Sequence, residues 1–426
     1  LTVTLILFSL LLLLLFLNVP LVVSIGLPTA LIMLGSGMKV ATLAQRTYAS
    51  VDSFTLMAIP FFMLAGKLME VGGMSKRIVR LADCLVGWMA GGLAHVIVVA
   101  SAFFGALSGS AAATTAAIGS TLIPEMKKRG YPADFVAGIQ AVAGALGVII
   151  PPSITMIMYG VCSSTSIGKL FMAGIVPGIV LALFLMVTIA YQAKKRKISQ
   201  MNTFTFKELG AAFLDAIPAL LVPTIILGGI YGGIFTPTEA GAVAATYGFL
   251  AGAFWYKEIN LQNIGNIMGG AIVNTVLVMI VVGASGAFSW LLTSAGVSSL
   301  LGKAISAIAG NKYIFLLVAN LIFIFIGMFI ESVAGILIVT PILLPIATSL
   351  GVDPVHFGII MVVNLALGLT TPPVGENQYI AAAIAEIPFE EEVKASIPFL
   401  IAGFAALAVI TYVEPLSLWL PGILGM

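Results

Sequence analysis

A motif that could unwind a membrane helix and free its carbonyl oxygens occurs twice in this sequence. Residues 147–152 (GVIIPP) return as residues 368–373 (GLTTPP), and each copy lies within a long apolar segment. Proline lacks a backbone N–H and clashes with the preceding turn, so each copy predicts a broken helix. Freed carbonyl oxygens suit a hard cation such as Na⁺, and the N-terminal ends of half-helices attract an anion. Broken helices at matching positions are typical of the ion and substrate site of a secondary transporter.

Two segments of unusual length precede these motifs. Residues 92–125 and 312–350 are each too long for one simple membrane span and too short for two, because about 20 residues cross a bilayer. Small and polar residues lie at their centres, among them Ser108, Ser110 and Glu331. We therefore expect two re-entrant hairpins whose tips face the two breaks. Small residues also allow close helix packing, but two clusters that each accompany a Pro-Pro break favour a binding site.

The spacing of these features predicts an internal repeat. The end of the hairpin and the break both recur after 221 positions, from Pro124 to Pro345 and from Pro151 to Pro372. The loop that follows the first hairpin, residues 125–132, is basic, whereas its counterpart contains no Lys or Arg. Under the positive-inside rule the two loops lie on opposite sides of the membrane, which predicts two repeats of inverted topology.

The composition predicts an all-α polytopic membrane protein. Hydrophobic residues make up 60% and charged residues 8% of the 426 positions, and the mean hydropathy is +1.16. These values exclude an ordinary soluble domain, and the apolar runs are longer than the strands of a membrane barrel. Residues 1–213 carry 15 Lys and Arg against 6 Asp and Glu, whereas residues 214–426 carry 4 against 11. The basic stretch 194–209 is interpreted as a cytoplasmic linker.

Glu331 lies in a stretch that is otherwise free of acid. Burying a carboxylate at membrane depth costs several kcal/mol (roughly 2.5–3.5 on insertion scales), so we expect a substrate contact, an ion-site ligand or a proton carrier there. The alternative is a carboxylate solvated by an aqueous cavity. Glu376 and Asn377, just beyond the second break, are further candidates of the same type. Glu239, three positions after Thr236, predicts a helix cap. The acidic run 390–392 either faces a partner protein or is a solvated loop; the sequence leaves both open, and the solvated loop is the preferred interpretation.

An enzyme and a channel are the alternative classes. Residues 283–286 (GASG) match the pattern that holds the serine of rhomboid-type intramembrane proteases, which would make Ser285 a nucleophile. His95 and His356 lie near the starts of their segments, whereas the partner histidine of such a serine belongs deep in a span. A channel requires an open pore, whereas broken helices favour alternating access. We therefore expect a transporter and not an enzyme.

Five strings together resemble the large membrane subunit (M) of tripartite ATP-independent periplasmic (TRAP) transporters, and the resemblance covers essentially the whole chain. They are residues 57–66 (MAIPFFMLAG), 103–110 (FFGALSGS), 150–153 (IPPS), 235–241 (FTPTEAG) and 371–375 (TPPVG). The resemblance implies a symporter of the bacterial inner membrane that imports a carboxylate-bearing solute with two or more Na⁺ ions and no organic cofactor. The implied partners are a small four-helix membrane subunit (Q), a periplasmic substrate-binding protein (P) and the lipid bilayer, with no nucleic acid. No such subunit precedes Leu1, so we expect Q as a separate or removed chain.

The resemblance also implies an elevator-type transporter, in which a transport domain moves against a scaffold. Residues 92–163 and 312–385 would form the two transport-domain repeats, each with a re-entrant hairpin and a Pro-Pro-broken helix. Residues 1–91, 164–311 and 386–426 would supply the scaffold helices.

Finally, the resemblance implies the binding residues. The first Na⁺ site maps onto Ser108, Ser110, Gly147, Ile150 and Pro152. The second maps onto Gly327, Glu331, Gly368, Thr371 and Pro373. Substrate contacts map onto Ser110, Ser153, Thr155 and Glu331. The chain is most similar to the sialic-acid (N-acetylneuraminate) branch. Import of a C4-dicarboxylate is the alternative, although an acid at Glu331 disfavours a doubly charged anion beside it.

Overall fold

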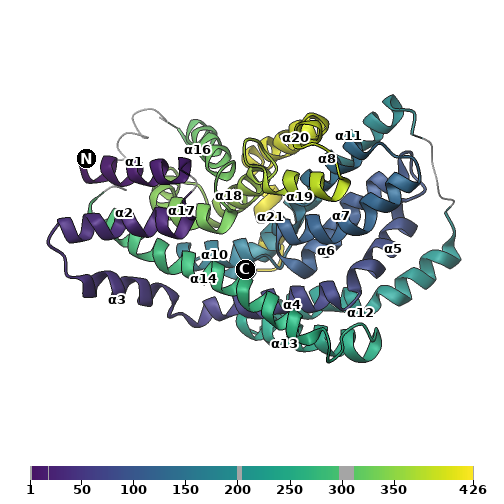
Figure 1. Ribbon diagram of the computed structural model, residues 1–426, viewed down its shortest axis with the longest axis horizontal. Coiled ribbons are helices and arrows are strands. Elements are labelled where there is room, and N and C mark those ends of the chain that lie inside the picture. Colours follow the sequence, from purple (N-terminus) through teal and green to yellow (C-terminus); the bar gives the residue numbers. More distant parts are fainter. Residues whose placement is uncertain (1, 18, 199–203, 297–310, 426) are drawn as a thin grey trace.

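Every regular element of the described residues (2–17, 19–198, 204–296 and 311–425) is a helix in this computed structural model (Figure 1). Parts of the predicted linker and scaffold, residues 199–203 and 297–310, lie outside the described residues. The first half contains α1 (Thr2–Phe16), α2 (Leu21–Gly35), α3 (Val40–Val51), η1 (Phe54–Met57), α4 (Ala58–Val71), α5 (Met74–Val86), α6 (Gly92–Ser108), α7 (Ala111–Lys128), α8 (Ala133–Ala143), α9 (Leu146–Ile149), α10 (Ile154–Ser163) and α11 (Ile167–Lys195). The second half contains α12 (Phe206–Tyr231), α13 (Pro237–Leu250), η2 (Ala251–Trp255), α14 (Ile264–Ser294), α16 (Lys312–Gly327), α17 (Ser332–Ser349), α18 (Pro354–Gly368), α19 (Glu376–Ala385), α20 (Phe389–Tyr412) and α21 (Pro415–Ile423).

The described helices include six that are long and apolar enough to cross a membrane, or seven if a bent pair counts as one span. The pair consists of residues 133–149 and α10, which meet at 44°. Large apolar side chains are exposed along α14, among them Ile272, Val273 and Leu277. Such a surface is unfavourable in water and suits lipid or partner helices. The prediction of an all-helical, multi-pass membrane protein is therefore confirmed.

The two hairpins and the two broken helices pack together. Helix α7 contacts α8 and α19, α9 contacts α6 and α18, and α17 contacts α10 and α18. Helices α2, α3 and α4 all contact α14, which also reaches α17. In Figure 1, α1, α2 and α3 lie at one end of the molecule, and α5 and α12 lie toward the other. The elements that hold the predicted binding residues are thus enclosed by helices from both halves of the chain.

The helix–turn–helix form predicted for the two long segments is present. The first turn is short, because Gly109 adopts a left-handed conformation (φ +62°) and Ser110 begins α7 as its N-cap. The second turn, residues 328–331, is two residues longer, and the Glu331 carboxylate caps α17 by accepting a 2.9 Å hydrogen bond from the Val333 N–H. The ending of either tip within a membrane stays a prediction.

Both Gly…Pro-Pro motifs interrupt a helix, as predicted. Residues 150–153 separate α9 from α10, and residues 369–375 separate α18 from α19. Both Pro-Pro peptide bonds are cis. Helices α7 and α17, and then α8 and α18, begin 221 positions apart, whereas α10 and α19 begin 222 apart. The register predicted from the prolines therefore holds at the starts of these two helix pairs before each break and shifts by one residue after it, whereas α6 and α16 begin 220 positions apart. The inverted topology stays a prediction.

Two charged segments differ from their interpretation as aqueous loops. Helix α11 extends to Lys195, so the linker begins inside its last turn, where basic side chains complement the helix dipole. The run 390–392 forms the first turn of α20, and Glu392 is fully buried there. The interpretation of this run as a solvated loop was wrong, because α20 packs against α8 and turns one of the three carboxylates inward. The cap predicted at Thr236 and Glu239 is confirmed as a capping box on α13.

Candidate substrate and ion site

The backbone of the first hairpin tip contacts the backbone of the first helix break. A Cβ built at Gly105 would lie 2.9 Å from Gly147 Cα, and one built at Gly109 would lie 3.0 Å from the Pro152 carbonyl oxygen. Only glycine allows so close an approach. The Ser110 carbonyl and Gly147 are also in contact. The structure thus brings Ser110, Gly147 and Pro152 of the predicted first Na⁺ site together at the tip.

The hydroxyl groups of this tip converge on one another. Ser108 Oγ lies 2.9 Å from Thr114 Oγ1 and 3.4 Å from the Ser110 carbonyl oxygen. Thr114 is fully buried on the first turn of α7 and contacts Gly147. Sequence reasoning missed Thr114, because its hydroxyl reaches the tip only when α7 folds back against α6. Neutral oxygens grouped in this way can bind a monovalent cation.

The backbone of the second hairpin tip also contacts its break, but this break is more exposed than the first. A Cβ built at Gly327 would lie 3.0 Å from Gly368 Cα. Thr371 is half-buried and donates its hydroxyl to the Leu367 carbonyl at 2.7 Å, whereas Pro373 is exposed. In the first break, by contrast, the corresponding proline is buried. The structure therefore brings the second tip and break together but encloses them less.

A cavity of about 450 Å³ lies where both tips approach helices α4 and α14. This volume falls within the roughly 300–1,000 Å³ of small-molecule sites. Three of the residues predicted to contact substrate line it, namely Ser110, Thr155 and Glu331. Ser153 does not line it: its buried hydroxyl donates to the Val148 carbonyl at 2.6 Å and accepts from the Met156 N–H as the cap of α10.

Four charged side chains line this central cavity, and sequence reasoning missed two of them. Glu331 is exposed where it faces the cavity, and Glu376 lies nearby on the first turn of α19. Lys67 and Glu70 project from α4 and pair with each other at 3.0 Å. The sequence carried little signal for them, because both lie at or just after the end of an apolar segment, where a charged side chain can reach the membrane interface. The cavity is therefore acidic, with one lysine among three carboxylates.

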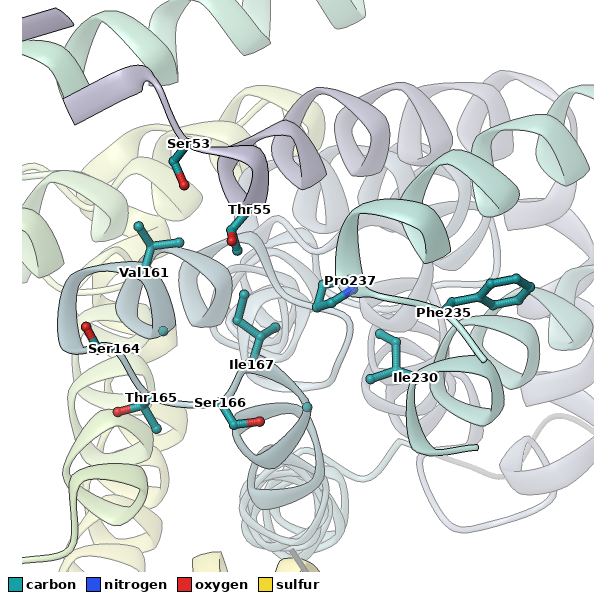
Figure 2. Close-up of a pocket in the computed structure, with 12 residues that line it drawn as sticks. Ser53, Thr55, Val161, Ser164, Thr165, Ser166, Ile167, Ile230, Phe235 and Pro237 are labelled. Atoms are coloured by element: carbon teal, nitrogen blue, oxygen red, sulfur yellow. The ribbon is translucent and has the colours of Figure 1, made fainter. Parts of the chain in front are cut away.

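A second cavity, of about 720 Å³, lies at the other end of α10. Figure 2 shows Ser53 and Thr55, from the segment before α4, across from the turn between α10 and α11. That turn supplies Ser164, Thr165 and Ser166, so the lining is rich in hydroxyls and contains no charged side chain among the described residues. Sequence reasoning did not find this cavity, because its walls come from three separate segments.

The serine expected of a protease has no partner here. Ser285 is buried on α14, and its hydroxyl has no hydrogen-bond partner among the described residues. His95 contacts the Ala90 carbonyl and His356 contacts the Thr411 carbonyl, each at 3.2 Å. The nucleophile and base that acyl transfer requires are therefore not paired.

These features define a multi-pass helical membrane protein whose cavity lies between broken helices. Residues 5–416 match the family described as the tripartite ATP-independent periplasmic transporter, DctM component. The C4-dicarboxylate TRAP transporter large permease protein DctM of Pseudomonas aeruginosa is 43% identical over 95% of each chain. The sialic acid TRAP transporter large permease protein SiaM of Vibrio cholerae is 37% identical over 89% of this chain and 88% of its own. The chain belongs to the TRAP transporter large permease family.

A solved structure supports the same type of fold. The YdaH transporter of Alcanivorax borkumensis aligns with a TM-score of 0.63 over 88% of this chain and 89% of its own, at 14% identity. Family membership makes this chain a transporter permease, in agreement with the expectation that it is not an enzyme. It also implies a small membrane subunit and a periplasmic binding protein as the other components.

Proposed function

We propose that this chain is the Na⁺-coupled permease that imports an organic acid bearing one carboxylate, with sialic acid as the leading candidate. The observation that carries the proposal is the central cavity, where both hairpin tips and the helices that follow both breaks expose polar groups. Hydroxyls of Ser110 and Thr155 and carboxylates of Glu331 and Glu376 offer hydrogen bonds to a solute rich in hydroxyls.

The charge of the cavity favours a monoanion. Lys67 is paired with Glu70, which leaves Glu331 and Glu376 without a cationic partner among the residues that line the cavity. A second carboxylate on the solute would approach like charges, and such approaches are unfavourable. Na⁺ ions held at the two tips would offset part of this repulsion, so their binding would favour that of the anion.

Import of a C4-dicarboxylate is the second candidate. The relative from Pseudomonas aeruginosa carries that substrate in its name and is more similar to this chain than the sialic acid permease cited above. A dianion would need more compensating positive charge in the cavity than Lys67 alone provides.

The proposed mechanism is an elevator motion in the bacterial inner membrane. Residues 92–163 and 312–385 would move as one body, because their hairpins and broken helices contact one another. The remaining helices would act as the scaffold, and the periplasmic protein would deliver the solute.

The test is uptake of radiolabelled N-acetylneuraminate or succinate into proteoliposomes that hold this chain and its small subunit. The binding protein is added outside, with and without an inward Na⁺ gradient, and Ser110→Ala is the site variant. We expect uptake of N-acetylneuraminate that requires Na⁺ and the binding protein and that falls in the variant. Uptake of succinate alone would reverse the order of the two candidates. Uptake that ignores the Na⁺ gradient would refute the coupling.

A further inference from the structure

The central cavity contains an ion pair whose two members lie on one helix. Lys67 Nζ lies 3.0 and 3.1 Å from the two Glu70 carboxylate oxygens, so the pair is bidentate. Both side chains are 32% exposed, and both line the cavity. The pair is therefore reachable by a solute inside the cavity.

The pair lies toward the cytoplasmic side. The basic end of α11, next to α12 in the chain, marks that side by the positive-inside rule. Arg77, on the first turn of α5, which follows α4 after two residues, pairs with Asp215 in the first three turns of α12. Lys67 lies near that end of α4, and its Cε is 3.5 Å from where a Cβ would stand on Gly270 of α14. A solute that leaves the cavity toward the cytoplasm therefore passes the pair.

Lys67 is the one cationic side chain among the described residues that line the cavity. An ammonium group has three donors and forms charge-assisted hydrogen bonds with carboxylates. The carboxylate of a solute and that of Glu70 are chemically alike, so they compete for the same ammonium. Partly exposed ion pairs are weak, so a solute carboxylate can replace Glu70 without a large loss.

We propose that Lys67 binds the carboxylate of the transported solute and that Glu70, by pairing again with Lys67, releases it toward the cytoplasm. The inference rests on the proposed function, since it assigns a recognition and an exit step to the same cavity.

The transport test compares Lys67→Gln, Lys67→Arg and Glu70→Gln in the proteoliposome assay, with N-acetylneuraminate and succinate as the probes. Lys67→Gln should raise KM at least about tenfold, the equivalent of one lost charge-assisted contact, and Lys67→Arg should restore part of it. Glu70→Gln should lower kcat without raising KM, because the competitor for release is gone. Lys76→Gln is the matched control, since Lys76 is 70% exposed and 4.0 Å from its partner Glu258, outside the cavity.

A second measurement does not depend on transport. Asn274 lines the cavity one turn from Gly270, so Asn274→Cys is placed in a chain whose Cys84 and Cys162 are replaced by alanine. Its reaction rates with an anionic and a cationic methanethiosulfonate are compared. Freeing Lys67 by Glu70→Gln should raise the anion-to-cation rate ratio by about tenfold, and Lys67→Gln should lower it.

The outcomes separate the two claims. If neither acid is transported but the rate ratio responds as expected, the proposed function fails and the anion site at Lys67 stands. If transport is normal, and Lys67→Gln changes neither KM nor the ratio, the inference is overturned. Equal losses of kcat in Lys67→Gln and Glu70→Gln, with KM unchanged, would reduce the pair to a structural contact and overturn it as well.

Discussion

Replacing Gly105 by alanine should separate the first hairpin from the first broken helix. The new methyl group would lie 2.9 Å from both Gly147 Cα and the Leu146 carbonyl oxygen. Both are backbone atoms, so no side chain can turn aside to make room. Forcing a methyl group into a packed interior costs about 1–3 kcal/mol. Alanine gains about 1 kcal/mol over glycine in a helix, so the expected net loss is up to about 2 kcal/mol.

The control is Gly269→Ala on α14, where an added Cβ meets nothing within 4 Å. This variant gains the helix preference without the clash, so it should be neutral or more stable. The measurement is the free energy of unfolding in a denaturing-detergent titration, together with the Na⁺ concentration that gives half-maximal uptake. Gly105→Ala should lower the free energy of unfolding and raise the Na⁺ concentration for half-maximal uptake, because it displaces the Gly147 backbone.

The contrast between the two variants decides the question. If they unfold at the same detergent fraction and need the same Na⁺ concentration, the two backbones are not in contact. If only stability falls in Gly105→Ala, the contact is real but Gly147 does not bind Na⁺.

Four further changes test other contacts. Tyr159→Phe removes a 2.6 Å hydrogen bond to the Pro354 carbonyl and should cost about 0.5–1.5 kcal/mol in the free energy of unfolding. Thr236→Ala should cost about 0.5–2 kcal/mol in the same titration, because it removes the N-cap of α13. Hydrogen bonds from the Thr236 N–H and hydroxyl lower the pKa of Glu239 from its usual 4.5. The loss of stability caused by Glu239→Gln should therefore be present above pH 4.5. It should disappear as the pH falls through the lowered pKa, where the parent carboxylate becomes protonated. Glu392→Gln should be at least as stable as the parent, because neither carboxylate oxygen has a partner among the described residues.

Contrary outcomes are defined for Tyr159→Phe, Glu239→Gln and Glu392→Gln. No loss in Tyr159→Phe would mean that water or a neighbour satisfies the carbonyl. A Glu239→Gln loss of stability that never diminishes as the pH is lowered would assign it to packing instead of charge. A large loss in Glu392→Gln would show that the carboxylate has a partner, such as a bound cation.

The parts of the site that sequence reasoning found are those set by local backbone chemistry. Proline and glycine determine where a helix breaks wherever they occur, so the breaks at Pro151 and Pro372 and the tip at Gly109 could be predicted from the sequence alone. Their common spacing then paired each tip with its break. The same reasoning worked for the cap at Thr236, because a capping box depends on residues three positions apart.

The parts that it missed depend on which face a helix turns inward. Lys67, Glu70 and Thr114 reach the site because α4 and α7 turn one particular face toward it. The apolar sequence around these residues is compatible with several orientations of each helix about its axis. Glu392 is buried because α20 meets α8, a contact between segments about 250 residues apart. Ser153 turns from the cavity because the chain after the break needs its hydroxyl as a cap.

Helix α10 forms part of the wall of both cavities. Ile154 and Thr155 at its first turn line the acidic cavity, and Gly160 and Val161 near its end line the hydroxyl-rich one. A displacement of this one helix changes the shape of both spaces at once. A solute in one cavity that favours a given position of α10 would alter the affinity of the other cavity for its own solute. By thermodynamic linkage, a solute in the second cavity would alter the affinity of the first by the same factor. A solute that favours one position of α10 would therefore couple the two cavities, even though no side chain is shared between them.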